Sequence, residues 1–156
     1  MIEIATRSVK ETKKVARMLA GELRARRARA AAVVALEGEL GAGKTAFAQG
    51  FAEALGVKGK IQSPTFVLMK IYSLGQKPKS KSRGPRRLVH IDCYRIDAPK
   101  DLLRVGLKEL LSDPGAIILI EWADRVKKLL PPSTLWLKFT HGGAIHERII
   151  RVDDSL

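Results

Sequence analysis

The chain has 156 residues, 46% of them hydrophobic, so it is long enough for one domain with a sizeable core and too short for two. Because it has no apolar run of transmembrane length, no signal-peptide-like amino terminus and only one cysteine, Cys93, we expect a single cytoplasmic domain over residues 1–156. The formal net charge of +13 favours polyanionic partners, nucleic acid first and an anionic membrane second, although a generally basic proteome would give the same balance.

A short strand and a helix are the first expected elements. Residues 2–5 are typical of a strand, and Ser8 to Glu11 has the form of a capping box at a helix start. The helix carries an apolar stripe and ends in a basic, alanine-rich run, whose cations suit a solvated helix end. The stripe comprises Val15, Met18, Leu19 and Leu23, and the basic run contains Arg24, Arg26, Arg27 and Arg29.

A strand, a glycine-rich loop and a helix follow in the order of a P-loop. Residues 33–36 are an apolar run, and residues 38–45 fit G-x-x-x-x-G-K-[ST] at every fixed position. The glycines allow backbone N–H groups to surround a phosphate at the positive end of the helix dipole. Lys44 can reach the β- and γ-phosphates, and the Thr45 hydroxyl can ligate Mg²⁺. The loop, which predicts nucleoside triphosphate binding, consists of Gly38, Glu39, Leu40, Gly41, Ala42, Gly43, Lys44 and Thr45.

Thr65 lies on the segment behind the P-loop helix, just before a strand expected over residues 66–72. A threonine in such a place can act as a switch that touches the metal or the γ-phosphate. Ser63-Pro64-Thr65 is also ordinary turn chemistry, so both interpretations stay open.

Residues 75–87 form a basic segment with six cations, no acid and almost no apolar residue. Such a segment cannot bury enough surface to fold alone, which predicts a flexible loop. It is the strongest sequence candidate for contact with a nucleic-acid phosphate backbone, without aromatic residues for base stacking; a solvated insertion without a partner is the alternative. Its cations are Lys77, Lys79, Lys81, Arg83, Arg86 and Arg87.

The second half of the chain alternates strands and helices. Residues 116–120 are apolar throughout, which is typical of a parallel strand inside an α/β sheet. The expected elements are a strand over 88–92, a helix over 99–111 with Leu102, Leu103, Leu107 and Leu110 inward, a strand over 116–121, a short helix over 122–130, and an antiparallel pair over 135–139 and 147–152.

Asp92 and Glu121 each end one of these strands and resemble the acid of a Walker B strand. Ligands of open α/β sheets bind beyond the carboxyl ends of the strands, so both acids can reach the γ-phosphate and its metal. We assign Glu121, which ends the most apolar strand, to Mg²⁺ together with Thr45, and Asp92 to the attacking water; the reverse assignment stays open. No Asn-Lys-x-Asp motif is present, which favours ATP over GTP.

The ordered set of motifs resembles the TsaE (YjeE) family, the small bacterial P-loop ATPases of tRNA threonylcarbamoyladenosine biosynthesis. The matching pieces are residues 38–45, 63–66, 90–95 and 120–122, and the resemblance extends over roughly residues 8–147. It implies an α/β fold of the P-loop NTPase type, a three-layer sandwich with a mostly parallel central sheet, helices on both faces and a C-terminal antiparallel hairpin.

The resemblance also implies a function, namely ATP hydrolysis with Mg²⁺ in support of a TsaD–TsaB-like complex. In that family TsaD transfers threonylcarbamoyl to a tRNA adenosine beside the anticodon, and TsaE does not perform the transfer. The family pattern places Thr45 and Glu121 at Mg²⁺ and gives Thr65 and Asp92 roles in hydrolysis. The basic segment departs from the pattern and leaves direct tRNA contact open.

Two other classes of protein share parts of the sequence signature. A small-molecule or nucleoside kinase also needs a P-loop and a strand-end carboxylate, but it normally adds an arginine-bearing lid and an acceptor pocket. A nucleic-acid-binding module with a vestigial P-loop is disfavoured, because Lys44, Thr45 and both strand-end acids are all present.

Overall fold

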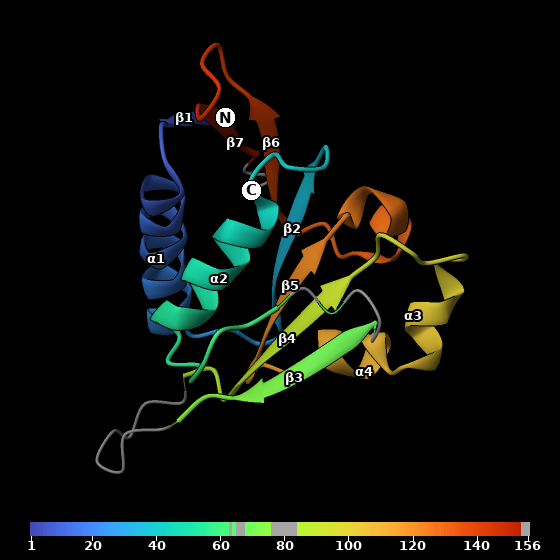
Figure 1. Cartoon of the computed structure of the whole chain (residues 1–156). Helices are drawn as coiled ribbons and strands as arrows, with labels where there is room; N and C mark the ends of the chain where they lie inside the picture. The colour runs from blue at the N-terminus through green and yellow to red at the C-terminus, as the bar shows by residue number, and fades with distance from the viewer. Residues whose placement is uncertain (63, 65–67, 76–83, 154–156) are drawn as a thin grey trace.

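A single mixed sheet runs through the part of the chain that the computed structural model describes, residues 1–62, 64, 68–75 and 84–153 (Figure 1). Its strand order is β1-β7-β6-β2-β5-β4-β3. The strands are β1 (Ile2–Thr6), β2 (Ala32–Gly38), β3 (Met69–Ser73), β4 (Arg87–Asp92), β5 (Ala116–Glu121), β6 (Leu135–His141) and β7 (Arg148–Asp153).

The four central strands are parallel, and antiparallel strands form both margins. β6, β2, β5 and β4 pair in parallel, whereas β3 is antiparallel to β4, and β7 is antiparallel to both β6 and β1. Every residue of β5 is buried, as its apolar sequence predicts. The expected antiparallel pair at the C-terminus is confirmed, and its first strand also joins the central sheet through β2.

Helices cover both faces of the sheet, which confirms the expected three-layer sandwich (Figure 1). α1 (Val9–Ala25) and α2 (Lys44–Ala54) cover one face, where Phe47, Phe51 and Leu119 belong to one apolar cluster. α3 (Lys100–Arg104), α4 (Leu107–Leu111) and the 3₁₀ helix η1 (Ala123–Leu129) belong to the other side, with Ile118 and Ile120 in a second cluster. None of the helices in the described residues has the length and apolar character to cross a bilayer.

α1 begins at the expected cap, and its expected apolar stripe is confirmed for Leu23, which is buried, and for Val15 and Leu19, which pack against the core. The Ser8 hydroxyl accepts a hydrogen bond from the Glu11 backbone N–H at 3.1 Å. Met18 is 67% exposed, so its place in the apolar stripe is wrong. Met18 lies about 160° around the helix from the buried Ala16 and Ala20, so it points away from the core. α2 packs very closely on α1, since a Cβ on Gly50 would lie 2.8 Å from the Lys13 Cα. The buried face is Thr12, Ala16, Ala20 and Leu23.

The single helix expected over residues 99–111 is wrong, because Gly106 divides it into α3 and α4. Gly106 has φ +91°, a left-handed conformation that ends α3, and its carbonyl accepts a hydrogen bond from the Leu110 N–H at the start of α4. The break also turns Leu103 outward, where it is 46% exposed instead of buried.

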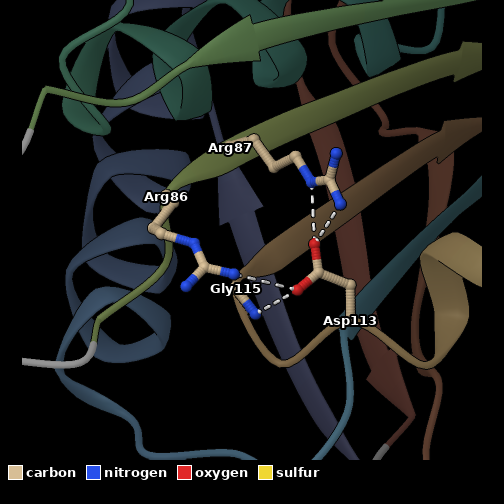
Figure 2. Close-up of polar contacts among 4 residues, drawn as sticks. All are labelled: Arg86, Arg87, Asp113 and Gly115. Carbon is tan, nitrogen blue, oxygen red and sulfur yellow. Dashed lines mark hydrogen bonds and ion pairs between the residues drawn. The ribbon is translucent and has the colours of Figure 1, made fainter.

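The C-terminal end of the basic segment is fixed to the sheet (Figure 2). Arg87 lies in β4, so the loop expected to extend to that residue ends before it. Both guanidinium groups contact the Asp113 carboxylate, with 2.7 Å from Arg87 Nε to Oδ2 and 3.4 Å from Arg86 Nη2 to Oδ1. The Gly115 N–H donates to Oδ1 at 2.9 Å. This N–H and then the arginines lower the pKa of Asp113. Lys77, Lys79, Lys81 and Arg83 lie outside the described residues.

Candidate nucleotide-binding site

The glycine-rich loop connects the carboxyl end of β2 to the start of α2, as the sequence pattern predicts. Gly38 has φ +148°, and a Cβ at this position would lie 2.5 Å from the Phe139 carbonyl oxygen. Gly43 has φ +106° and is the residue before the first turn of α2. Both positions therefore require glycine. The first N–H groups of α2, which have no partner within the helix, follow the loop at the carboxyl end of β2.

Lys44 folds back across the loop and is only 5% exposed. Its Nζ donates hydrogen bonds to the carbonyl oxygens of Gly38 at 2.5 Å and Glu39 at 2.7 Å. The same ammonium lies 4.1 Å from the centre of the Trp122 ring, a cation–π contact. Burial lowers the pKa of Lys44, and the nearby carboxylates of Glu121 and Asp124 oppose that shift.

Glu121 is held at both carboxylate oxygens by neighbouring side chains. The Thr45 hydroxyl donates to Oε1 at 3.1 Å, and His90 Nε2 lies 3.0 Å from Oε2. Both His90 and Glu121 are buried, and His90 Nδ1 has no hydrogen-bond partner among the described residues. Sequence reasoning missed His90, although its position two residues before Asp92 on the same face of β4 could have indicated it.

Asp92 lies directly opposite Glu121 in the register of β4 and β5. Neighbouring strands are about 4.8 Å apart, so the two carboxylates lie side by side at the carboxyl end of the sheet. Asp92 Oδ1 accepts a hydrogen bond from the Tyr94 backbone N–H at 2.8 Å. The structure thus brings Lys44, Thr45 and both acids to the carboxyl end of the parallel strands. Thr65 lies outside the described residues.

Tyr94 and Trp122 form an aromatic pair beside Lys44 at this end of the sheet. Trp122 has φ +58°, a left-handed conformation that a bulky residue adopts only when its surroundings hold it there. Its ring lies 4.9 Å from that of Tyr94, and the Arg125 guanidinium carbon lies 5.6 Å and 5.8 Å from the two ring centres. The sequence predicts Trp122 only as the start of a helix, because nothing in the local pattern indicates its backbone conformation.

A cavity of about 480 Å³ opens over the loop, within the size range of small-molecule sites. The far end of the chain contributes to it, since Arg148 of β7 donates a hydrogen bond from Nε to the Gly41 carbonyl oxygen at 3.2 Å. Arg7 and His146 also line the cavity. Sequence reasoning missed these three residues, because only the pairing of β1 with β7 brings both chain ends to the loop. The described lining residues are Arg7, Ser8, Val9, Thr12, Leu40, Gly41, Gly43, Lys44, Thr45, Ala46, Trp122, His146 and Arg148.

Comparison with known protein families gives an extensive match. The sequence pattern of the family described as "Threonylcarbamoyl adenosine biosynthesis protein TsaE" matches residues 6–150. The chain belongs to the TsaE family. TsaE proteins take part in the biosynthesis of threonylcarbamoyladenosine in tRNA, so the family connects this chain with the tRNA modification machinery.

Individual TsaE proteins and one solved structure agree with this assignment. The TsaE protein of Bacillus subtilis is 38% identical over 134 residues, which cover 85% of this chain and 73% of the relative. That of Rickettsia prowazekii is 38% identical over 126 residues, which cover 80% and 76%. The crystal structure of Bacillus subtilis YdiB superposes with a TM-score of 0.73 at 30% identity, covering 99% of this chain and 86% of YdiB. This similarity supports the P-loop NTPase-like fold.

Proposed function

We propose that this TsaE-family protein is a Mg²⁺-dependent ATPase that supports a TsaD–TsaB-like complex in the threonylcarbamoyl modification of tRNA. The observation that carries the proposal is the contact between Thr45, at the start of α2, and the buried Glu121 carboxylate. This contact joins the motif expected to bind phosphate to a strand-end acid 76 residues further along the chain. A glycine-rich turn without a ligand would not require that acid.

The donor set fits both a polyphosphate and Mg²⁺. The backbone N–H groups at the start of α2 and the Lys44 ammonium are suited to phosphate oxygens. The Thr45 hydroxyl and the Glu121 carboxylate would hold Mg²⁺, which prefers oxygen ligands and commonly combines one or two protein groups with phosphates and water. When bound, the ion would neutralise charge on the phosphate oxygens.

Asp92 is the side chain that we propose orients the attacking water and accepts its proton. Asp92 is the last residue of β4, which pairs with the strand that Glu121 ends. The Tyr94 N–H donates a hydrogen bond to one Asp92 oxygen, so the carboxylate is positioned before substrate arrives. Lys44 would stabilise charge on the phosphoryl group during transfer. We also propose a role in hydrolysis for Thr65, on the family pattern alone.

The test of the nucleotide site is Lys44→Ala. Loss of a hydrogen bond to a charged group costs roughly 1.5–3 kcal/mol, so ATP binding measured by titration calorimetry should weaken by about 10- to 100-fold. Lys108→Ala, which removes an exposed lysine on α4, is the matched control and should bind ATP normally. A folded Lys44→Ala protein with undiminished ATP binding would contradict the P-loop assignment.

Two further measurements separate the ATPase from its alternatives and test the partner. Released inorganic phosphate identifies a hydrolase, whereas a kinase would transfer the phosphoryl group to an added acceptor. Co-purification with a TsaD–TsaB-like pair in the presence of ATP tests the partner complex. If neither the wild type nor Lys44→Ala associates with that pair, the partner assignment is wrong even when ATP is hydrolysed.

A further inference from the structure

A second cavity, of about 360 Å³, lies at the end of the sheet opposite the P-loop. Residues 26–33, between α1 and the start of β2, line it together with Ser133, Thr134 and Leu135 before β6. β2 begins in this cavity and ends at Gly38, and a seven-residue strand extends about 23 Å. The cavity is therefore separate from the candidate nucleotide site.

Three arginines give this cavity its character. Arg26, Arg27 and Arg29 line it and are exposed, and its described lining residues include no carboxylate. In the described part of the chain no acid forms an ion pair with any of them, whereas Arg17, Arg86, Arg87, Arg104 and Arg151 all have such partners. Arg26 caps α1 by donating a hydrogen bond from its backbone N–H to the Leu23 carbonyl oxygen. Its guanidinium group takes no part in this cap.

The charge extends along the same end of the molecule. Because β2 and β4 both pair in parallel with β5, they begin at the same end of the sheet (Figure 1). Arg86 directly precedes β4, and its side chain is 63% exposed. α2 starts at the P-loop and runs back toward this end (Figure 1), and the exposed Lys58 and Lys60 follow it within six residues of its last residue, Ala54. This basic end comprises Arg26, Arg27, Arg29, Lys58, Lys60 and Arg86.

We propose that the cavity lined by Arg26, Arg27 and Arg29 binds the phosphate backbone of tRNA. Guanidinium forks match phosphate oxygens with paired hydrogen bonds, and the exposed Ser133 hydroxyl is a further donor. None of the described residues that line the cavity is aromatic, so it contacts the backbone and does not stack bases. The site goes beyond the proposed ATPase, because it requires neither nucleotide nor the P-loop.

A lipid surface fits this end of the molecule less well than RNA. Interfacial membrane binding needs exposed large apolar side chains beside the cations. Here the large apolar lining residues, Leu23, Val33 and Leu135, are buried or half-buried, and the exposed ones between the arginines are alanines. A concave, polar and cationic surface is suited to a phosphate backbone.

The test compares two triple variants of the full chain for binding to unmodified tRNA. Arg26→Gln/Arg27→Gln/Arg29→Gln removes three charges at the cavity, and Lys14→Gln/Lys100→Gln/Lys128→Gln removes three exposed charges elsewhere. Fluorescence anisotropy between about 50 and 200 mM salt gives the affinity and its salt dependence. The cavity variant should bind about 10- to 100-fold more weakly and lose about two to three units of log–log salt slope, while the control changes little.

Several outcomes would overturn the proposal. Equal losses in the two triple variants would indicate unspecific charge attraction, and no loss in the cavity variant would exclude the site. Displacement of tRNA by saturating ATP would place the contact at the P-loop. Arginine-dependent binding to vesicles containing phosphatidylserine, without arginine-dependent tRNA binding, would assign the cavity to a membrane.

Folding and catalysis provide the remaining controls. Arg27→Gln/Arg29→Gln leaves the helix-capping residue Arg26 in place and should show an intermediate loss if the triple variant is unstable. ATP hydrolysis by the cavity variants should equal that of the wild type. Since tRNA binding is measured without nucleotide, failure of this proposal and failure of the proposed ATPase give different results.

Discussion

Glu121 and Asp92 end neighbouring strands, yet their carboxylates are held by different groups. Glu121 contacts Thr45 and His90 through its two oxygens and is almost fully buried. Asp92 is fixed at one oxygen by the Tyr94 backbone N–H. An acid that shares a hydrogen bond with the P-loop hydroxyl is the better candidate for the metal, and its neighbour is the better candidate for the water.

This difference predicts distinct phenotypes for two substitutions. Glu121→Ala should raise the Mg²⁺ concentration needed for tight ATP binding, because an oxygen ligand is lost. Asp92→Asn should leave that concentration nearly unchanged and slow hydrolysis by about 10²–10⁴-fold, the usual effect of losing a general base. The measurements are Mg²⁺-titrated ATP binding and single-turnover hydrolysis. If only Asp92→Asn shifts the Mg²⁺ dependence, the two roles are reversed.

Cys93 follows Asp92 directly and is fully buried. Burial and the Asp92 charge raise the pKa of its thiol to about 12. Near neutral pH the native protein should therefore react with a thiol-specific reagent only as fast as it unfolds, and denaturant should expose one thiol per chain. Fast labelling of the native state at pH 7 would contradict this burial. As the pH rises above about 9, the raised pKa favours the unfolded state, so stability should fall.

At the scale of elements, the sequence predicted those helices, strands and loops whose formation depends on neighbouring residues in the chain. The apolar run of β5, the Ser8 cap and the loop at residues 38–45 all carry strong local signals, and the structure has each of them. The break at Gly106 was missed because a single glycine in a helical pattern does not reveal its sign of φ. The exposure of Met18 depends on which side of α1 faces the core, which is tertiary information.

Because α1 and α2 approach closely, Gly→Ala substitutions at two positions should change the free energy of unfolding in opposite directions. Gly21 in α1 has no atom within 4 Å of its missing Cβ, whereas a Cβ on Gly50 in α2 would lie 2.8 Å from the Lys13 backbone. Gly21→Ala should raise the free energy of unfolding by about 0.5–1 kcal/mol through helix propensity alone. Gly50→Ala should lower it, since overpacking typically costs about 1–3 kcal/mol and exceeds that gain. Urea unfolding of both variants is the measurement, and stabilisation by Gly50→Ala would contradict the packing.

At the scale of the whole molecule, the central residues of the candidate site could be predicted from the sequence, but the residues that surround them could not. Lys44, Thr45, Asp92 and Glu121 could be named because motif and strand-end position reveal them. Arg148 could not, because only the sheet order places β7 beside the P-loop. The Arg26–Arg29 cavity was interpreted from sequence as a solvated helix end, and its concave shape appears only when β2 and β6 are placed side by side.

Asp113 connects this basic end to the stability of the whole chain. Its carboxylate holds the starts of β4 and β5 together through the Gly115 N–H, Arg87 and Arg86, and this N–H and then the arginines lower its pKa below the ordinary 3.8 (Figure 2). A group with a depressed folded-state pKa stabilises the protein above its unfolded pKa, and that contribution is lost as the pH falls through the folded value.

Asp113→Asn should therefore lower the free energy of unfolding at pH 7 and flatten its decline below about pH 4. The expected loss at pH 7 is about 1 kcal/mol, because the Arg86 and Arg87 side chains are 63% and 41% exposed and the amide oxygen can still accept one hydrogen bond. Asp97→Asn, at an exposed acid without a described partner, is the matched control and should leave the pH profile unchanged. Urea unfolding between about pH 3 and 7 measures both variants. An Asp113→Asn profile that runs parallel to that of the wild type through the acid range would show that this carboxylate does not tie the two strands together in solution.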